Sequence, residues 1–275
     1  MSAPGAADPV ASGWRGRVLD VVAGLVLLYL FVPIFVIVLY SFNRPSGRYN
    51  FVWKAFSLEA WRDPFKYSSL VDSMKLSLEI AAISTSVAIV FGALIALALC
   101  RYRFRGSPAI DLLLVLPLTT PEVVLGSALL SLFLQLDTRS GFATVVIAHI
   151  MFQVSYVALT VKARIRGFDW SLEDAAMDLG ARPLRVVWKV TLPLIAPGIA
   201  AAAMLSFALS MDDFIITLFN AGSQVTYPLY VYGAQRSAYP PQINVMATAI
   251  LVASLLVLGI TVLWQRRTES RRAGG

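Results

Sequence analysis

Six apolar stretches, each long enough to cross a lipid bilayer, constrain the possible folds of this chain more than any other feature. They lie at about residues 18–42, 75–100, 109–136, 141–163, 194–219 and 244–264. A helix rises about 1.5 Å per residue, so roughly 20 apolar residues cross a hydrocarbon core of about 30 Å. Because a helix bonds its own backbone groups, it is the structure that such stretches favour in lipid. The sequence therefore predicts an all-α membrane protein with six transmembrane helices.

The composition agrees with lipid as the main solvent of the chain. The 275 residues are 58% hydrophobic and 14% charged, with a mean hydropathy of +0.72, whereas soluble domains carry about 25% charged residues. The net charge of +7 flanks the apolar stretches instead of forming one basic patch, so nucleic-acid binding is not expected. The single cysteine, Cys100, excludes an internal disulfide and disfavours a cysteine metal cluster. No metal or cofactor is expected in this chain.

Lys and Arg residues predict the orientation, because they are enriched in cytoplasmic loops. Most of the 23 lie in or beside residues 1–17, 101–108, 164–193 and 265–275. These segments alternate with two long outer loops, 43–74 and 220–243, and a short outer turn near Asp137–Gly141. The prediction is a transmembrane domain over residues 18–264, between cytoplasmic tails of residues 1–17 and 265–275.

The two long outer loops are rich in aromatic residues. These are Tyr49, Trp53, Phe56, Trp61, Phe65 and Tyr67 in the first loop, and Tyr227, Tyr230, Tyr232 and Tyr239 in the second. Aromatic side chains gather at membrane surfaces, so an interfacial belt is one interpretation. A docking surface for a soluble protein outside the cell is the other, and the sequence leaves both open.

The 164–193 loop carries a pattern of fixed spacing between the fourth and fifth apolar stretches. It reads Asp174-Ala175-Ala176, then Gly180, then Val190 and finally Leu192-Pro193. An ordinary juxtamembrane helix lying on lipid headgroups would share this composition, but it would not require the spacing.

Local signals in this loop predict two short helices. Ser171 is expected to cap the first helix, with Asp174 three residues later completing a capping box. Gly180 is expected to end that helix. Pro183 suits the first turn of a second helix.

The spacing resembles the coupling loop of ATP-binding-cassette (ABC) importer permeases. The usual pattern is Glu-Ala-Ala, three residues, Gly, nine residues, Ile, one residue and Leu-Pro. Here Asp174 replaces Glu and Val190 replaces Ile. Over nearly its whole length, the chain resembles the smaller-type permease subunit of spermidine/putrescine importers. The stretches that carry this resemblance are residues 101–106, 120–122, 166–169, 209–214 and 243–248.

The resemblance implies a type I ABC importer permease fold in a bacterial inner membrane. It also implies a second homologous permease, a dimer of ATPase subunits and an extracytoplasmic binding protein that delivers a polyamine. The residues expected to couple to the ATPase are Asp174, Ala175, Ala176, Gly180, Leu192 and Pro193. The chain lacks the Gly-x-x-x-x-Gly-Lys-Ser/Thr phosphate loop. It is therefore not expected to be an enzyme, and ATP with Mg²⁺ is expected on the partner ATPase.

Acidic residues at membrane depth are costly and are therefore candidates for function. Glu122 follows Pro117 and Pro121, which should bend or break the third stretch near mid-bilayer. Asp212 and Asp213 lie late in the fifth stretch. A path lined by these three carboxylates would suit a polyamine cation. The alternative is that they pair with Arg or backbone groups where helices meet, and adjacent Asp212 and Asp213 cannot both face one cavity squarely.

Two other polar residues lie in apolar stretches. Glu79 is near the outer interface and is expected only to reach toward water. His149, the only histidine, is expected to be packed and hydrogen-bonded, since one histidine makes no metal site.

Other functions are less consistent with the pattern. An ion-driven secondary transporter would suit Glu122 and the proline-broken stretch, but it leaves the spacing of the 164–193 loop unexplained. A membrane-embedded enzyme would need a catalytic motif that the sequence does not show. Within the permease class, another cationic or small organic solute is the main alternative to a polyamine.

Overall fold

The computed structural model describes residues 14–102 and 104–273. These ranges contain α-helices, one π-helical turn and two isolated bridges, but no strand. They form two compact units, Met1–Tyr67 with Ala234–Gly275, and Ser68–Gly233. Residues 1–13 of the predicted N-terminal tail, and residues 274–275, lie outside the described residues.

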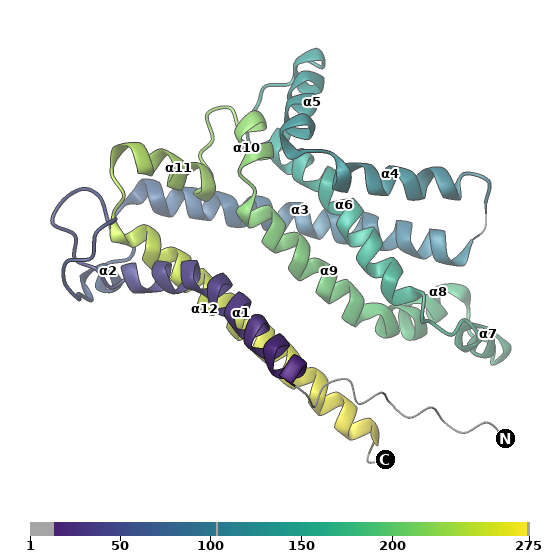
Figure 1. Cartoon of the computed structure of the whole chain (residues 1–275). Helices are drawn as coiled ribbons and strands as arrows, with labels where there is room; N and C mark the ends of the chain where they lie inside the picture. Colours follow the sequence, from purple (N-terminus) through teal and green to yellow (C-terminus); the bar gives the residue numbers. More distant parts are fainter. Residues whose placement is uncertain (1–13, 103, 274–275) are drawn as a thin grey trace. The chain divides into compact units, whose positions relative to one another are not determined.

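Three long helices form the centre of the second unit. They are α3 (Ser68–Arg101), α6 (Phe142–Ile165) and α9 (Leu192–Asp212), and they run side by side (Figure 1). Small residues permit this close packing. A Cβ atom added to Gly92 would lie 2.6 Å from the Cβ of Val157. Helices in lipid associate largely through such close contacts, because lipid is as apolar as the side chains.

The predicted third span is broken into two helices. These are α4 (Ser107–Thr119) and α5 (Glu122–Gln135), bent by 109° relative to each other. Pro121 disfavours a helical backbone at the residue before it, and Thr120 is extended with ψ 130°. The stretch over residues 109–136 is thus a broken span, and the break lies at Pro121, as the proline signal predicted.

The fifth span also differs from its prediction. It begins in the 164–193 loop, where α8 (Pro183–Val186) continues through the π-helical turn η1 (Val187–Thr191) into α9. It ends at Asp212, and a separate helix α10 (Ile215–Asn220) follows. Asp213 between them is extended, with φ −62° and ψ 121°. The apolar stretch predicted as one helix over residues 194–219 is thus interrupted near its outer end.

The first unit contains α1 (Trp14–Tyr40), α2 (Glu59–Arg62) and α12 (Pro241–Ala273), with α1 beside α12 (Figure 1). Helix α11 (Tyr227–Ser237) crosses the boundary between the units. Asn43 and Asn50 order the segment after α1, because Asn43 Nδ2 donates to Asn50 Oδ1 over 2.7 Å.

Four helices in the described part of the chain are long and apolar enough to cross a membrane, and the bent α4–α5 pair makes a fifth. The apolar region Pro241–Leu256 of α12 is shorter. Part of the predicted sixth span, residues 257, 258 and 261–264, lies outside the residues whose side chains are described. The structure therefore does not reproduce the six-span count in full.

Candidate functional site

The first short helix of the 164–193 loop is α7 (Ser171–Asp178), and Asp169 holds its start. The Ser171 N–H donates to Asp169 Oδ1 over 3.0 Å. Hydrogen bonds from the Ser171 hydroxyl and N–H lower the pKa of the Asp169 carboxyl. Trp170 already has helical backbone angles, and no side chain caps the helix from Ser171. The expectation that Ser171 caps the helix is therefore wrong, because the chain becomes helical one residue earlier.

Gly180 ends α7, as the sequence predicts. Its φ is +83°, in the left-handed region that favours glycine. The Gly180 N–H donates to the Met177 carbonyl, and the Ala181 N–H donates to the Ala176 carbonyl. This pair of bonds is the Schellman arrangement that terminates helices. No atom outside its chain neighbours lies within 4 Å of an added Cβ, so the space beside Gly180 is open.

The outward surface of the loop combines small and large apolar residues. Asp174 and Ala175 are exposed, and Ala176 is half-buried. Leu179 is 90% exposed and Leu184 is 71% exposed. These side chains give the polar loop an exposed apolar area beside its small residues.

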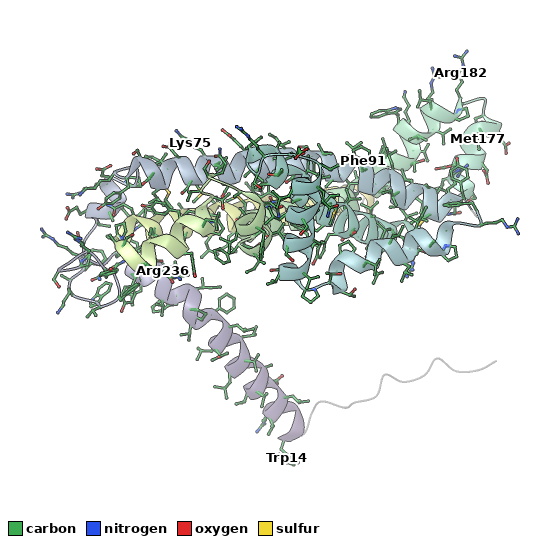
Figure 2. The ribbon with its side chains drawn as sticks, turned by 90° about the horizontal axis from the view of Figure 1, so that it is seen from above. Trp14, Lys75, Phe91, Met177, Arg182 and Arg236 are labelled. Atoms are coloured by element: carbon green, nitrogen blue, oxygen red, sulfur yellow. The ribbon has the colours of Figure 1, made fainter. Side chains whose placement is uncertain are left out.

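The remaining motif residues lie at the start of α9. Leu192 packs against the central hydrophobic cluster, whereas Pro193 is exposed. Figure 2 shows Met177 and Arg182 of the loop at the opposite end of the second unit from Lys75. The loop therefore lies at one end of the three central helices, and its second short helix runs into α9 without a gap.

Glu173 is buried beneath the loop, only 4% exposed, although Leu172 and Asp174 beside it are exposed. Its carboxylate forms an ion pair with Arg101, the last residue of α3. It also accepts a hydrogen bond from the Thr191 hydroxyl, at the end of η1. Sequence reasoning missed this residue, and its only signal was an acidic side chain directly before the motif.

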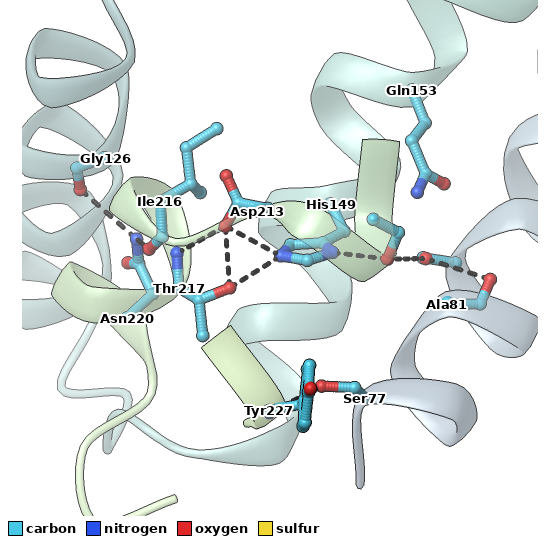
Figure 3. A network of polar contacts seen from close by, with 12 residues as sticks. Ser77, Ala81, Gly126, His149, Gln153, Asp213, Ile216, Thr217, Asn220 and Tyr227 are labelled. Atoms are coloured by element: carbon cyan, nitrogen blue, oxygen red, sulfur yellow. Dashed lines mark hydrogen bonds and ion pairs between the residues drawn. The ribbon is translucent and has the colours of Figure 1, made fainter. Parts of the chain in front are cut away.

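A second polar site lies where α9 gives way to α10 (Figure 3). Asp213 Oδ2 accepts hydrogen bonds from the Thr217 N–H and hydroxyl, and it lies 3.3 Å from His149 Nε2. His149 Nδ1 lies 2.7 Å from the Ser210 hydroxyl, which lies 3.4 Å from the Ser84 hydroxyl. His149 is 1% exposed. The histidine is thus packed and hydrogen-bonded, as predicted, and this network joins α3, α6, α9 and α10.

The structure separates the two adjacent aspartates. The Asp213 side chain is 5% exposed and faces His149 of α6, whereas Asp212 is exposed. Glu122 is also exposed, as the first residue of α5. Asp212 and Glu122 therefore each lie at a helix break with their side chains accessible, and Asp213 lies at a helix contact.

The two broken spans meet in the second unit, where α5 packs against α10. Asn220 Nδ2 donates to the Gly126 carbonyl over 3.2 Å and to the Ile216 carbonyl over 2.9 Å (Figure 3). A Cβ added to Gly126 would lie 2.9 Å from the Phe219 ring. This close contact fixes the two breaks relative to each other.

Known proteins support one family for this chain. Residues 88–273 match the family model described as the binding-protein-dependent transport system inner membrane component. The spermidine/putrescine transport system permease protein PotC of Haemophilus influenzae is 34% identical over 246 residues, covering 89% of this chain and 95% of that protein. The putrescine transport system permease protein PotI of Escherichia coli is 36% identical over 271 residues, covering 96% and 94%.

Solved structures share the fold at lower identity. A bacterial ABC transporter involved in the import of the acidic polysaccharide alginate has a chain with a TM-score of 0.69 and 15% identity. The match covers 92% of this chain and 96% of that one. An amino acid ABC transporter matches with a TM-score of 0.57, 18% identity and coverage of 73% and 94%. The predicted all-α membrane fold, that of a type I ABC importer permease, is confirmed, and the chain belongs to the family of binding-protein-dependent transport system inner membrane components.

Proposed function

We propose that this chain is the permease subunit of an ABC importer for polyamines such as spermidine and putrescine. The observation that carries the proposal is the similarity to permeases named for spermidine and putrescine, which extends over most of both chains. The chain forms half of the translocation pathway, and a second homologous permease forms the other half. The complex lies in a bacterial inner membrane with both termini of this chain in the cytoplasm.

The other subunits supply energy and substrate. A dimer of ATPase subunits binds ATP with Mg²⁺ and contacts the exposed surface around Asp174–Gly180. An extracytoplasmic binding protein docks on loops 43–74 and 220–243 and delivers the polyamine. ATP binding closes the ATPase dimer, and the 164–193 loop carries this motion into the spans, so the pathway opens alternately to each side. The exposure of Leu179 and the continuity of α8 with α9 support this role of the loop.

The acidic residues at the helix breaks attract the cationic substrate. Asp212 and Glu122 are exposed at the ends of broken helices, where a carboxylate can meet an ammonium group directly. Asp213 takes part differently. Its bonds to Thr217 and its approach to His149 hold the break at which Asp212 is presented.

A different solute remains the alternative within the same permease class. The molybdenum transport system permease protein ModB of Mycobacterium bovis is 33% identical over 215 residues, covering 72% of this chain and 81% of that protein. Exposed carboxylates at both breaks disfavour an anionic solute, because like charges repel. Another cationic or small organic solute fits them as well as a polyamine does.

The test is ATP hydrolysis by the complete complex reconstituted in lipid with its binding protein. Spermidine or putrescine should stimulate hydrolysis and uptake, and Asp212→Asn should lose both effects. Asp137→Asn changes an exposed acid in the turn after α5, outside the proposed path and docking surfaces, and serves as the control. Stimulation by molybdate or an uncharged solute alone would remove the polyamine assignment, and the absence of an associated ATPase would remove the proposed role of the loop.

A further inference from the structure

We infer that Arg101 and Glu173 form a clamp that positions the 164–193 loop on the ends of α3 and α9. Arg101, Trp170, Glu173 and Thr191 are together called the loop clamp. The loop clamp holds the loop rigidly against these helices. A displacement of α7 would therefore move α3 and α9 and would not deform the loop. This role rests on the proposed function, because it concerns how the loop passes on a displacement.

The clamp joins three elements at a single carboxylate. Glu173 belongs to α7, and its side chain turns inward while the neighbours Leu172 and Asp174 are exposed. One bond runs to the Arg101 guanidinium at the C-terminus of α3. The other comes from the Thr191 hydroxyl, one residue before α9 begins. A displacement of Glu173 therefore pulls on the ends of two central helices together.

Arg101 is held from a second side. Its guanidinium carbon lies 5.1 Å from the centre of the Trp170 ring, a distance at which a cation is attracted to the face of an indole. Trp170 and its neighbour Phe168 pack against the central hydrophobic cluster. The planar guanidinium can stack and bond at once, which a lysine ammonium cannot do. The arginine is thus fixed in orientation as well as in charge.

The π-helical turn η1 explains why a side-chain link between the loop and α9 is useful. Thr191 closes the π-helical turn η1, in which the Leu192 N–H bonds to the Val187 carbonyl. A π-helical turn is a wide and uncommon arrangement that often occurs at functional sites. Because α8 enters α9 through this turn, the backbone path from the loop to α9 runs through an irregular helical segment. The hydrogen bond from Thr191 to Glu173 links α7 directly to the end of this segment through side chains.

Stability alone does not account for a buried ion pair. Removing a carboxylate from water is unfavourable, and well-packed apolar residues in its place are often as stable or more so. A pair of this kind does define one geometry, because a shifted loop would leave the Glu173 charge buried without a partner. The clamp therefore makes intermediate positions of the loop unfavourable.

The test compares uptake per ATP hydrolysed in the reconstituted complex. Glu173→Gln keeps the shape and a hydrogen bond to Thr191 but removes the charge, and Arg101→Lys keeps the charge but removes the stacking fork. Both complexes should assemble in near wild-type amounts and hydrolyse ATP, while uptake per ATP falls by about 5- to 150-fold, the usual range for coupling between sites. Asp137→Asn, at an exposed position in the turn after α5 and outside the 164–193 loop, should leave the ratio unchanged.

A double variant separates positioning from support of the fold. If the two residues act as one device, Arg101→Lys with Glu173→Gln should lose no more coupling than the worse single variant. Unchanged uptake per ATP in Glu173→Gln would overturn the inference. So would losses of uptake and hydrolysis that merely follow a loss of assembled complex. The wild-type response to spermidine tests the proposed substrate separately, because the ratio can be measured with whichever solute stimulates the complex.

Discussion

Asp213 Oδ2 lies 3.3 Å from His149 Nε2 at the point where the fifth span stops being a helix. The same oxygen accepts two hydrogen bonds from Thr217, at the start of α10. The aspartate is thus shared between α6 and α10. This sharing gives the break in the span a defined position without a proline or glycine.

The first prediction concerns this pair. His149→Leu should destabilise the protein by about 1–3 kcal/mol, because it removes a buried polar partner of the Asp213 carboxylate and leaves it only the bonds from Thr217. The double variant His149→Leu with Asp213→Asn should recover part of that loss, since no buried charge remains. Thermal unfolding of the purified complex measures both. A double variant less stable than His149→Leu would show that the two residues do not act as a pair.

The pair also shows which part of the fold could be read from the sequence. Long apolar stretches identified α3 and α6, and Pro117 with Pro121 located the break between α4 and α5. The break at Asp213 was not predicted. Apart from Asp212 and Asp213, the sequence around it is largely apolar and has no proline or glycine, and the Asp213 carboxylate is held by His149, which lies on another helix.

In the 164–193 loop, too, local signals predicted one feature, whereas contacts with distant residues decided another. Gly180 could be predicted as a helix end because its requirement is local, a backbone conformation that glycine adopts at little cost. Glu173 could not be distinguished from Asp174 by local signals. Only its contacts with Arg101 and Thr191, residues on two other elements, separate a buried anchor from an exposed neighbour.

The second prediction tests the close approach of α3 and α6. Gly92→Ala would place a Cβ 2.6 Å from that of Val157 and 3.0 Å from the backbone nitrogen of Ala158, so the helices must separate. Overpacking of this kind should cost about 1–3 kcal/mol. Thermal unfolding and the amount of membrane-inserted protein measure the effect.

The matched control for this prediction is Gly233→Ala in α11. No atom lies within 4 Å of a Cβ added there, so the same change should have little effect on stability. Equal losses in the two variants would mean that glycine matters for its backbone freedom at both positions. In that case, helix packing at Gly92 would not be the cause.

The third prediction concerns Asn220, which joins the two broken spans through the Gly126 carbonyl. Asn220→Leu should remove this bond, so the buried Gly126 carbonyl would lose the donor that α10 supplies. Interhelical hydrogen bonds in membranes contribute about 0.6 kcal/mol on average and up to about 1.7 kcal/mol. We expect a stability loss of this order by thermal unfolding. A larger fall in polyamine-stimulated uptake than in stability would indicate that the α5–α10 contact also holds the pathway.

The fourth prediction separates backbone strain from bulk at Gly180. Asparagine tolerates the left-handed conformation better than other side chains, whereas most others pay roughly 1–2 kcal/mol there. Gly180→Asn should therefore keep α7 intact and retain uptake. Gly180→Arg adds a long charged side chain to a space that is open within this chain and that we propose the ATPase approaches.

The expected result for Gly180→Arg is an assembled complex that hydrolyses ATP without uptake. The measurement is the ratio of polyamine uptake to ATP hydrolysis in proteoliposomes, with Gly180→Ala as a third variant that carries the strain but little bulk. If Gly180→Ala is as defective as Gly180→Arg, strain at the end of α7 is the cause, and the open space has no special role. If Gly180→Arg transports normally, no protein surface closes over this glycine, and the loop does not couple the ATPase to the spans at this point.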